Sequence, residues 1–336
     1  MSRYRAFRIH NDDQGYRAGV EDLPLRAPAS GEVLVRVSHS SVNYKDALAG
    51  TGKGKILRTF PLVGGIDAAG AVERSNDGRY REGDLVVATG WGLSFDHDGG
   101  YAQYLCLPGD WLVPCPAGLD PRSAMILGTA GFTAALAIHR MQINGQRPEM
   151  GPILVTGATG GVGSVAIDIL HRLGYEVAAV SGKEALHDWL RGLGATQILG
   201  RDELPGERRP LENAVWGGAV DNVGGEMLAQ ITRTVRPWGN IASIGLAGGH
   251  ELHATVMPFI LRAVSLLGCN SVDVPYPLRS QLWERLAGDW RPPHLEEILT
   301  ATETLETLPR VFEQVLGGKI HGRVLVQTDG EGSGPP

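Results

Sequence analysis

Cysteine is scarce in this chain. Cys106, Cys115 and Cys269 are the three cysteines among 336 residues, and their odd number and wide spacing exclude a disulfide framework of the kind that holds small secreted domains together. We therefore expect reduced thiols in a cytoplasmic protein. Aromatic residues make up only 6% of the chain, but the hydrophobic share of 43% and the length are sufficient for two domains, each with its own core.

Excess positive charge and long apolar runs are also lacking. The chain has 31 Lys and Arg against 37 Asp and Glu, and the resulting net charge of −6 argues against a nucleic-acid partner. Residues 2–8 contain no apolar signal core. The longest apolar stretch, Ser123–Ile138, is interrupted by Gly128 and Gly131 and is too short to cross a bilayer, so we expect no membrane partner.

Glycine, by contrast, is abundant, with 47 residues. An apolar strand predicted at Ile153–Thr156 runs into the glycine-rich turn Gly157–Gly163, and a helix at Val165–Leu173 and a strand at Glu176–Val180 are predicted after it. A tight turn, close approach to a pyrophosphate and close helix–strand packing each require a residue without a Cβ. This order of elements predicts a dinucleotide site at the start of the helix. Its cofactor-binding residues are Thr159, Gly160, Gly161 and Val162.

The end of the second strand indicates which dinucleotide binds. Sites for NAD place an acidic residue about 20 residues beyond the glycines, on the ribose hydroxyls. Here the strand ends in Ser181, Gly182 and Lys183, and Arg201 follows the next apolar segment, Gln197–Leu199. Two unit charges about 4 Å apart near a surface interact by roughly 4 kcal/mol before desolvation, so these cations favour a 2′-phosphate. We predict NADPH as the cofactor; the alternative is that Lys183 and Arg201 are solvated loop residues.

The chain divides into a β-rich first part and an alternating second part. Strands are predicted at Tyr4–Ile9, Glu32–Ser38, Ala68–Arg74, Asp84–Thr89 and Tyr101–Leu107. From Ser123 onward helices and strands alternate, with a helix through Met141, strands at Gly218–Val223 and Asn240–Ile244 and a helix at Glu226–Thr234. A helix at Leu308–Leu316 and a strand at Arg323–Gln327 are expected to return to the first part. The fold class is therefore α/β, with a doubly wound parallel sheet beside a β-rich domain.

Several motifs, in this order, resemble those of a known family. They are Ser41–Leu48, Thr51–Ile56, Gly65–Gly70, Gly128–Ala134, Val180–Lys183 and Val256–Arg262. The chain resembles the acrylyl-CoA reductase family, in the quinone-oxidoreductase-like branch of the medium-chain dehydrogenase/reductase superfamily; one departure is Gly64, where the family has proline. The resemblance implies a GroES-like catalytic domain in residues 1–123 and 264–329, a Rossmann NADPH-binding domain in residues 124–263, and a homodimer. Residues 330–336 are expected to form a flexible tail.

The same superfamily contains zinc alcohol dehydrogenases, which provide a useful contrast. Where those enzymes have a ligating Cys this chain has Asn43, and where they have His followed by Glu it has Ile66 followed by Asp67. Catalytic zinc needs three ligands of Cys, His or acid type, so we expect no metal. Without a Lewis acid, an alkoxide is hard to stabilise. Hydride addition to an activated C=C bond needs only near-attack geometry, hydrogen-bond donors for the enolate and a proton. Reduction of acrylyl-CoA to propionyl-CoA, which the resemblance implies, fits these needs.

Asn43, Tyr44 and Asp67 are the catalytic candidates. The resemblance places Tyr44 beside the nicotinamide end of the cofactor, where its phenol positions that end or supplies a proton; the alternative is a buried structural tyrosine. Asn43 offers an amide donor and acceptor. Asp67 pairs with Lys45 or relays a proton, and its alternative is a turn cap after a strand.

Two further sets of residues are candidates for binding. Thr129, Gly245 and Leu246 are predicted to contact the cofactor, since Gly245 follows a strand end in an open α/β sheet. Lys53, Lys55 and Arg58 form a basic cluster that suits the phosphates of CoA, unless it is a solvated loop face. The first hypothesis for function is an NADPH-dependent acrylyl-CoA reductase. The alternatives are a general quinone or enone reductase and a non-catalytic NADPH-binding protein.

Overall fold

The computed structural model describes residues 2–204 and 209–328. Within these, the chain forms two compact units. The first holds the residues up to 129, residues 272–288 and those from 295 onward; the second holds residues 130–271 and 289–294. The sequence placed the second domain at residues 124–263, whereas the second unit spans residues 130–271 and also includes residues 289–294. The expected tail, residues 330–336, lies outside the described residues.

The first unit is rich in β structure. Its strands are β1 (Arg3–Asp12), β2 (Gly15–Pro24), β3 (Glu32–Ser41), β4 (Leu62–Val63), β5 (Asp67–Ser75), β6 (Leu85–Thr89), β7 (Tyr104–Pro108), β8 (Val113–Pro114), β15 (Leu299–Glu303) and β16 (Arg323–Gln327). Its helices are α1 (Tyr44–Thr51), α7 (Tyr276–Ala287), α8 (Leu295–Ile298) and α9 (Leu308–Leu316). The five strands predicted in this part of the sequence are confirmed, and so are the C-terminal helix and strand.

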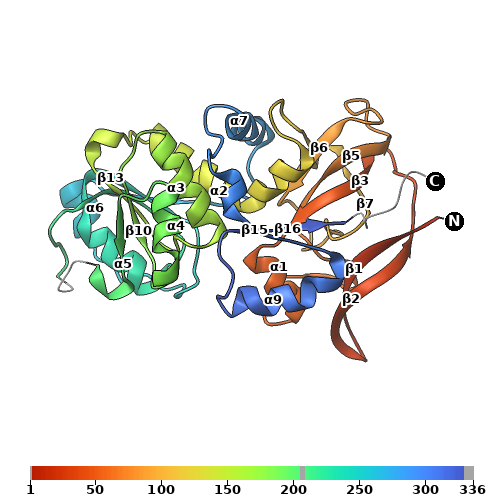
Figure 1. The fold of residues 1–336 in the computed structure, drawn as a ribbon, viewed down its shortest axis with the longest axis horizontal. Helices are drawn as coiled ribbons and strands as arrows, with labels where there is room; N and C mark the ends of the chain where they lie inside the picture. Colours follow the sequence, from red (N-terminus) through yellow and green to blue (C-terminus); the bar gives the residue numbers. More distant parts are fainter. Residues whose placement is uncertain (1, 205–208, 329–336) are drawn as a thin grey trace. The chain divides into compact units, whose positions relative to one another are not determined.

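Strand β3 is the centre of the larger sheet in this unit (Figure 1). It pairs with β5 along one edge, whereas its other edge pairs with β7 near its start and with β16 near its end. The sheet order is β15-β16-β3-β5-β6-β8, and β2, β1 and β4 form a separate small sheet. Because β16 pairs with Ser41 at Leu325, the end of the described chain lies beside the residues that open α1.

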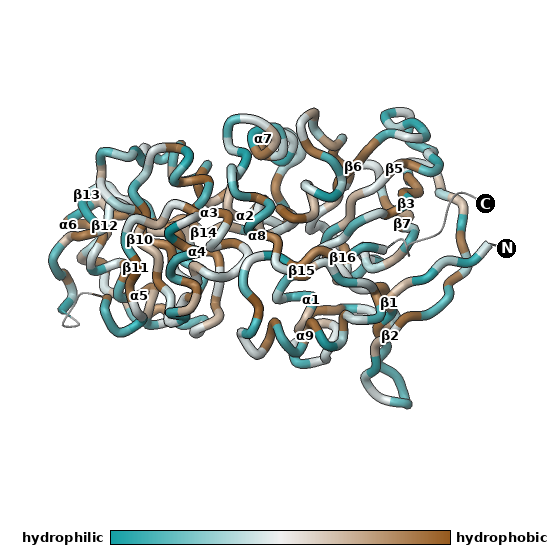
Figure 2. The backbone as a smooth tube through the Cα atoms, viewed as in Figure 1, coloured by the Kyte–Doolittle hydropathy of each residue, from teal (hydrophilic) through white to brown (hydrophobic). Residues whose placement is uncertain are grey.

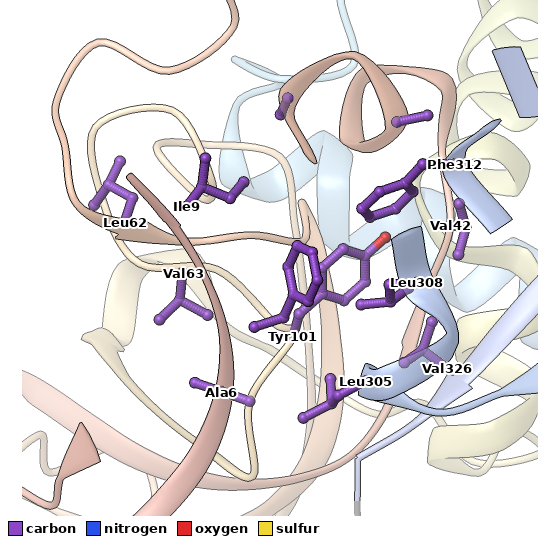
Figure 3. Packing of buried hydrophobic residues seen from close by; sticks show 14 of the residues in the cluster. Ala6, Ile9, Val42, Leu62, Val63, Tyr101, Leu305, Leu308, Phe312 and Val326 are labelled. Atoms are coloured by element: carbon purple, nitrogen blue, oxygen red, sulfur yellow. The ribbon is translucent and has the colours of Figure 1, made fainter. Parts of the chain in front are cut away.

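One core of the first unit lies between the small sheet, α1 and α9 (Figure 3). Phe7, Tyr101 and Phe312 meet there, with the Phe7 ring centroid 6.4 Å from that of Tyr101 and 5.7 Å from that of Phe312. Both contacts are edge-to-face, which is a preferred arrangement for aromatic pairs. Residues from both ends of the chain therefore hold α1 in place.

The second unit is a six-stranded parallel sheet with helices. Its strands are β9 (Ile153–Val155), β10 (Val177–Val180), β11 (Gln197–Leu199), β12 (Trp216–Asp221), β13 (Val235–Ser243) and β14 (Ser265–Gly268), and its helices are α3 (Gly161–Arg172), α4 (His187–Gly192), α5 (Gly225–Thr234) and α6 (Met257–Arg262). The strand order is β11-β10-β9-β12-β13-β14, and every pairing is parallel. The central strands β9, β10 and β12 are buried throughout and largely hydrophobic (Figure 2), as expected for a parallel sheet covered on both faces. The predicted doubly wound fold is confirmed.

Helix α2 (Pro121–Ile143) contains a break at Gly128, whose φ of 51° and ψ of −155° are not helical. Among the described residues it is the one helix long and apolar enough to cross a membrane, and it is longer than the apolar stretch predicted from the sequence. However, 83% of its most apolar 18-residue window is buried inside the protein, as in a core helix. Its apolar composition is therefore explained by packing.

Candidate active site and cofactor site

The glycine turn in the second unit joins β9 to α3. Gly157 has a φ of 58°, which favours glycine, and Gly160 is the extended residue before the helix. A Cβ on Gly163 would lie 2.4 Å from the carbonyl oxygen of Gly157, so the helix packs directly on the turn. The helix starts at Gly161 rather than at the predicted Val165, because Gly161–Ser164 already form its first turn. Thr159, Gly160, Gly161 and Val162 are all at least partly exposed at this N-terminus, where free N–H groups can bind phosphate.

The ends of β10 and β11 bring together the residues predicted to select NADPH. The N–H of Ser181 donates to the carbonyl of Leu199 (2.9 Å), and the Ser181 hydroxyl accepts from the N–H of Lys183 (3.1 Å). The Cβ position of Gly182 lies 3.9 Å from Nε of Arg201. Burial and the neighbouring Arg201 guanidinium lower the pKa of Lys183. The cations Lys183 and Arg201 therefore lie near the carboxyl ends of two neighbouring strands, an arrangement that favours a bound anion.

Gly245 and Leu246 follow β13 at the same edge of the sheet. A Cβ on Gly245 would lie 2.1 Å from the carbonyl oxygen of Asn222, so this loop lies against the end of β12. Leu246 is exposed. The loop is thus placed where ligands bind in open α/β sheets.

Sequence reasoning missed Asn222, which lies between the glycine turn and this loop. Its N–H and side-chain amide donate to Oγ1 (2.9 Å) and the carbonyl oxygen (2.8 Å) of Thr156. Oγ1 of Thr156 in turn donates to Asp221 (2.6 Å). These contacts fix the amide so that Oδ1 of Asn222 is buried with no hydrogen-bond partner among the described residues. The available signal was the Asp221–Gly225 segment, in which an acid, an amide and two glycines follow an apolar strand.

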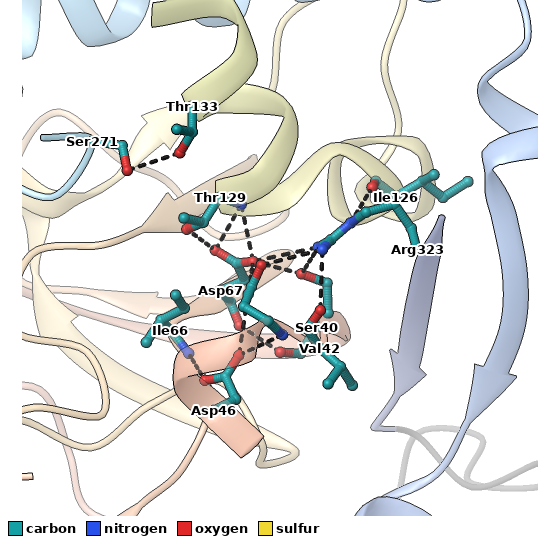
Figure 4. A network of polar contacts seen from close by, with 12 residues as sticks. Ser40, Val42, Asp46, Ile66, Asp67, Ile126, Thr129, Thr133, Ser271 and Arg323 are labelled. Carbon is teal, nitrogen blue, oxygen red and sulfur yellow. Dashed lines mark hydrogen bonds and ion pairs between the residues drawn. The ribbon is translucent and has the colours of Figure 1, made fainter. Parts of the chain in front are cut away.

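In the first unit, hydrogen bonds converge on the carboxylate of Asp67 (Figure 4). This residue begins β5 and is fully buried. Oδ2 accepts from Ser41 Oγ (2.5 Å), Asn43 Nδ2 (2.8 Å) and the N–H of Thr129 (3.0 Å). Oδ1 accepts from Thr129 Oγ1 (2.5 Å). The positive partner is Arg323, whose Nη2 lies 4.0 Å from Oδ2, and not the Lys45 considered from the sequence.

Arg323 holds this cluster together from β16. It is 3% exposed and donates to the carbonyls of Ile126 and Val42, to Asn43 Oδ1 (3.2 Å) and to Ser41 Oγ (2.7 Å). A Cβ on Gly128 would lie within 3 Å of Ser41 Oγ, Asp67 Oδ2 and Arg323 Nη2. The break in α2 therefore brings the backbone so close to the cluster that a side chain at Gly128 would not fit.

The start of α1 carries the other two catalytic candidates. Both contacts of the Asn43 side-chain NH2 are to carboxylates, Asp67 Oδ2 and Asp46 Oδ2 (3.1 Å). Tyr44, the first residue of the helix, is 54% exposed, so it is not the buried structural tyrosine considered as an alternative. The structure thus gathers Asn43, Asp67 and Thr129, and leaves the phenol of Tyr44 open to solvent.

The basic residues after α1 do not converge. Lys53 Nζ pairs with Glu313 of α9 at 2.7 Å, and Arg58 lies over the ring of Phe95 with 4.2 Å between its Cζ and the ring centroid. Lys55 is exposed. The ion pair of Lys53 favours the alternative of a solvated loop face over a site for the phosphates of CoA. Across residues 2–204 and 209–328 there is no group of three His, Cys, Asp or Glu side chains arranged to hold a metal.

Comparisons with known proteins identify the family. Residues 29–117 match the alcohol dehydrogenase GroES-like domain, and residues 161–287 match the family described as zinc-binding dehydrogenase. The chain is 48% identical to the probable acrylyl-CoA reductase AcuI of Escherichia coli, over 97% of this chain and 100% of that protein. It is 47% identical to the putative quinone oxidoreductase YhfP of Bacillus subtilis, over 91% of this chain and 92% of that protein.

Solved structures agree with this match. The YhdH oxidoreductase of Salmonella enterica, crystallised with NADP, is 46% identical, covers 97% of this chain and 100% of its own, and superimposes with a TM-score of 0.92. YhfP, crystallised with NAD, is 43% identical over 97% of this chain and 100% of its own, with a TM-score of 0.93. The chain belongs to the acrylyl-CoA reductase family, in the quinone-oxidoreductase-like branch of the medium-chain dehydrogenase/reductase superfamily.

Proposed function

We propose that this protein is an NADPH-dependent, zinc-independent reductase that converts acrylyl-CoA to propionyl-CoA. One observation carries the proposal: 48% identity over nearly the whole chain to a probable acrylyl-CoA reductase. The replacement of zinc ligands by Asn43 and Ile66 supports it, because neither side chain binds zinc. The direct test follows NADPH absorbance with purified protein and acrylyl-CoA. No oxidation above the rate without enzyme would contradict the proposal.

In this reaction a hydride adds to the β carbon, the charge develops on the thioester oxygen, and a proton adds to the α carbon. NADPH supplies the hydride when bound. We propose that Asn43 and Asp67 fix the start of α1 and that the exposed phenol of Tyr44 is the group free to face cofactor or substrate. The Asn43 side chain donates to Asp67 and accepts from Arg323, which also forms an ion pair with Asp67 at 4.0 Å. Turnover by Tyr44→Phe, Asn43→Ala and Asp67→Ala tests this. Near-native rates in all three variants would contradict this assignment of the active site.

We propose that Lys183 and Arg201 bind the 2′-phosphate of NADPH. A hydrogen bond to a charged group contributes about 1.5–3 kcal/mol, so Lys183→Ala or Arg201→Ala is expected to raise the KM for NADPH roughly tenfold or more and to leave the KM for NADH nearly unchanged. Lys319→Ala, at an exposed lysine of the first unit, is the control. An unchanged ratio of the KM values for NADPH and NADH in both variants would contradict this assignment. NADH is a useful comparison because the related YhfP was crystallised with NAD.

A general quinone or enone reductase is the second candidate, because YhfP is named as a putative quinone oxidoreductase. Acrylyl-CoA and a quinone, assayed side by side, separate the two. A Lys53→Ala/Lys55→Ala variant then tests CoA recognition: an increase in KM for acrylyl-CoA but not for a short enone supports it, and equal changes argue against it. NADPH binding without oxidation by any of these substrates would favour a non-catalytic protein.

We propose that the protein is a cytoplasmic homodimer that acts on a small molecule, without nucleic-acid or membrane partners. The three cysteines are free thiols. Strand β14 is an edge of the parallel sheet, and Leu266 on it, Ile260 and Leu261 on α6, and Trp238 are exposed apolar side chains of the same unit. Such a surface suits a second copy of the chain. Light scattering is expected to give the mass of a dimer and, for Ile260→Glu/Leu261→Glu, that of a monomer.

A further inference from the structure

A second buried carboxyl, that of Asp46, belongs to the Asp67 cluster. It is 2% exposed and is the third residue of α1. Its Oδ2 accepts from the N–H (2.9 Å) and the side-chain amide (3.1 Å) of Asn43, and its Oδ1 accepts from the N–H of Ile66 (3.0 Å). One NH2 group, that of Asn43, is thereby shared between the two carboxyls of Asp46 and Asp67.

The charges that face Asp46 do not balance if both carboxyls are ionised. Asp67 faces it from β5, Arg323 from β16, and the phenol of Tyr101 lies against it from the segment before β7. Arg323 is the cation that reaches both carboxyls, and its Nη2 lies 4.0 Å from Asp67. Arg279 of α7 also faces Asp67, but the first carboxylate that acts on it is Asp273. A second buried negative charge would therefore have no counterion within the cluster, which is costly in a dry environment. Burial, and then the charge of Asp67, raise the pKa of Asp46 to about 7.

We propose that the Asp46–Asp67 pair binds one proton at neutral pH, that Asp46 holds it, and that this neutral carboxyl positions the start of α1. The cluster of two carboxyls, one proton and one guanidinium is then electrically neutral. Asp46 caps the N–H of Asn43, which directly precedes Tyr44. When the proton leaves to solvent at higher pH, two buried carboxylates repel each other across the same Asn43 amide, and the contact between Asn43 and Asp67 weakens. Asp46 is a positioning residue because it acts through Asn43 and Tyr44.

The proton can be observed directly on the wild-type protein. In a carbon-13 NMR titration with carboxyl-labelled aspartate, the Asp46 carbon is expected to keep its protonated shift up to about pH 6 and to change with a midpoint near 7. The N–H of Ile66, assigned through the backbone, should shift with the same midpoint because it donates to Asp46 Oδ1. Asp12, exposed and paired with Arg17, is the control and should already be ionised, since Arg17 lowers its pKa to about 2. An Asp46 carbon that is ionised across the whole range would overturn the proposal.

Two variants distinguish an effect of the Asp67 charge on Asp46 from an effect of burial alone. Asp67→Asn removes the neighbouring charge, so the Asp46 midpoint is expected to fall toward its ordinary value of about 4. Asp46→Asn assigns the carbon signal; if that variant does not fold, the Ile66 N–H still reports on the wild type. A midpoint in Asp67→Asn equal to that of the wild type would contradict the shared proton.

The kinetic consequence rests on the proposed function, whereas the NMR test needs no substrate. With acrylyl-CoA, kcat is expected to fall about tenfold for each unit of pH above the midpoint, with a smaller change in KM. Asp46→Asn should lose this alkaline decline. A proton observed by NMR together with a kcat that does not change with pH would overturn the positioning role. If the protein shows no reductase activity, the proposed function fails, and the NMR titration still tests whether Asp46 is protonated.

Discussion

Arg323 is the residue on which the buried charges of the first unit depend most. Its guanidinium lies within reach of both Asp46 and Asp67, whereas Arg279 reaches only Asp67 of the two, and the side chains of Arg323, Asp46 and Asp67 are at most 3% exposed. Removing one partner of a buried ion pair leaves an uncompensated charge, which typically costs about 3–5 kcal/mol. We therefore expect Arg323→Met to lower the free energy of unfolding by about that amount in urea denaturation.

Arg310→Met is the matched control for that experiment. Arg310 on α9 also pairs with a carboxylate, Glu303, but its side chain is 61% exposed. Exposed ion pairs contribute about 0–1 kcal/mol, so the control should lose little stability. Similar losses in the two variants would mean that burial does not set the strength of the Arg323 pair.

At the scale of elements, the glycine turn and α3 form a close backbone contact in the cofactor site. A Cβ on Gly163 would lie 2.4 Å from the oxygen of Gly157 and 2.8 Å from Cα of Ala158, so the backbone must shift to admit a methyl group. We expect Gly163→Ala to lower the stability by about 1–3 kcal/mol, as overpacking commonly does, and to weaken NADPH binding at least tenfold. Fluorescence titration with NADPH measures the second effect.

Gly192→Ala in α4 is the control for the glycine turn. No heavy atom lies within 4 Å of its Cβ position, and alanine is favoured over glycine in helices by about 1 kcal/mol. NADPH affinity should not change, and stability should stay equal or rise. If both variants bind NADPH like the wild type, the turn does not hold the phosphates.

Local pattern predicted the first elements of the nucleotide unit well but missed elements in both units. The strand–turn–helix–strand order over residues 153–180 was readable because each element has its own apolar period. Strand β2 was missed because most of its side chains are exposed or half-buried, and Gly15–Pro24 shows no clean alternation. Strand β14 was missed because four residues carry too little signal. These elements exist because partner strands pair with them.

The same limit applies to the candidate site. The sequence singled out Asn43 and Asp67, but the partner of Asp67, Arg323, forms a hydrogen bond with a residue 282 positions away, Ser41. No local pattern reveals a contact of that range. Asn222 was hidden for a different reason, since its role depends on the loop after β13 lying against it.

At the scale of the whole molecule, carboxyls with opposite pKa shifts determine how stability depends on pH. Hydrogen bonds from Arg26 and Arg79 lower the pKa values of Glu32 and Asp77 to about 2. Their contribution is present above the unfolded pKa of about 4 and is lost as pH falls toward 2. Burial acts in the opposite direction on Asp46, Asp168 and Asp221, whose pKa values are raised. Their contribution is present below about pH 4 and is lost as pH rises through the folded pKa.

The buried group should dominate, because Glu32 and Asp77 pair with arginines that are more than half exposed, and water and salt screen such pairs. Between about pH 4 and 7 the folded protein binds more protons than the unfolded chain at Asp46, so stability is expected to decline across this range and to level off above it. Urea midpoints measured from about pH 4.5 to 8 test the sign, and Asp46→Asn should flatten the decline while Asp77→Asn should not. Midpoints that rise steadily with pH in the wild type, or an unchanged slope in Asp46→Asn, would show that Asp46 is ionised in the folded state.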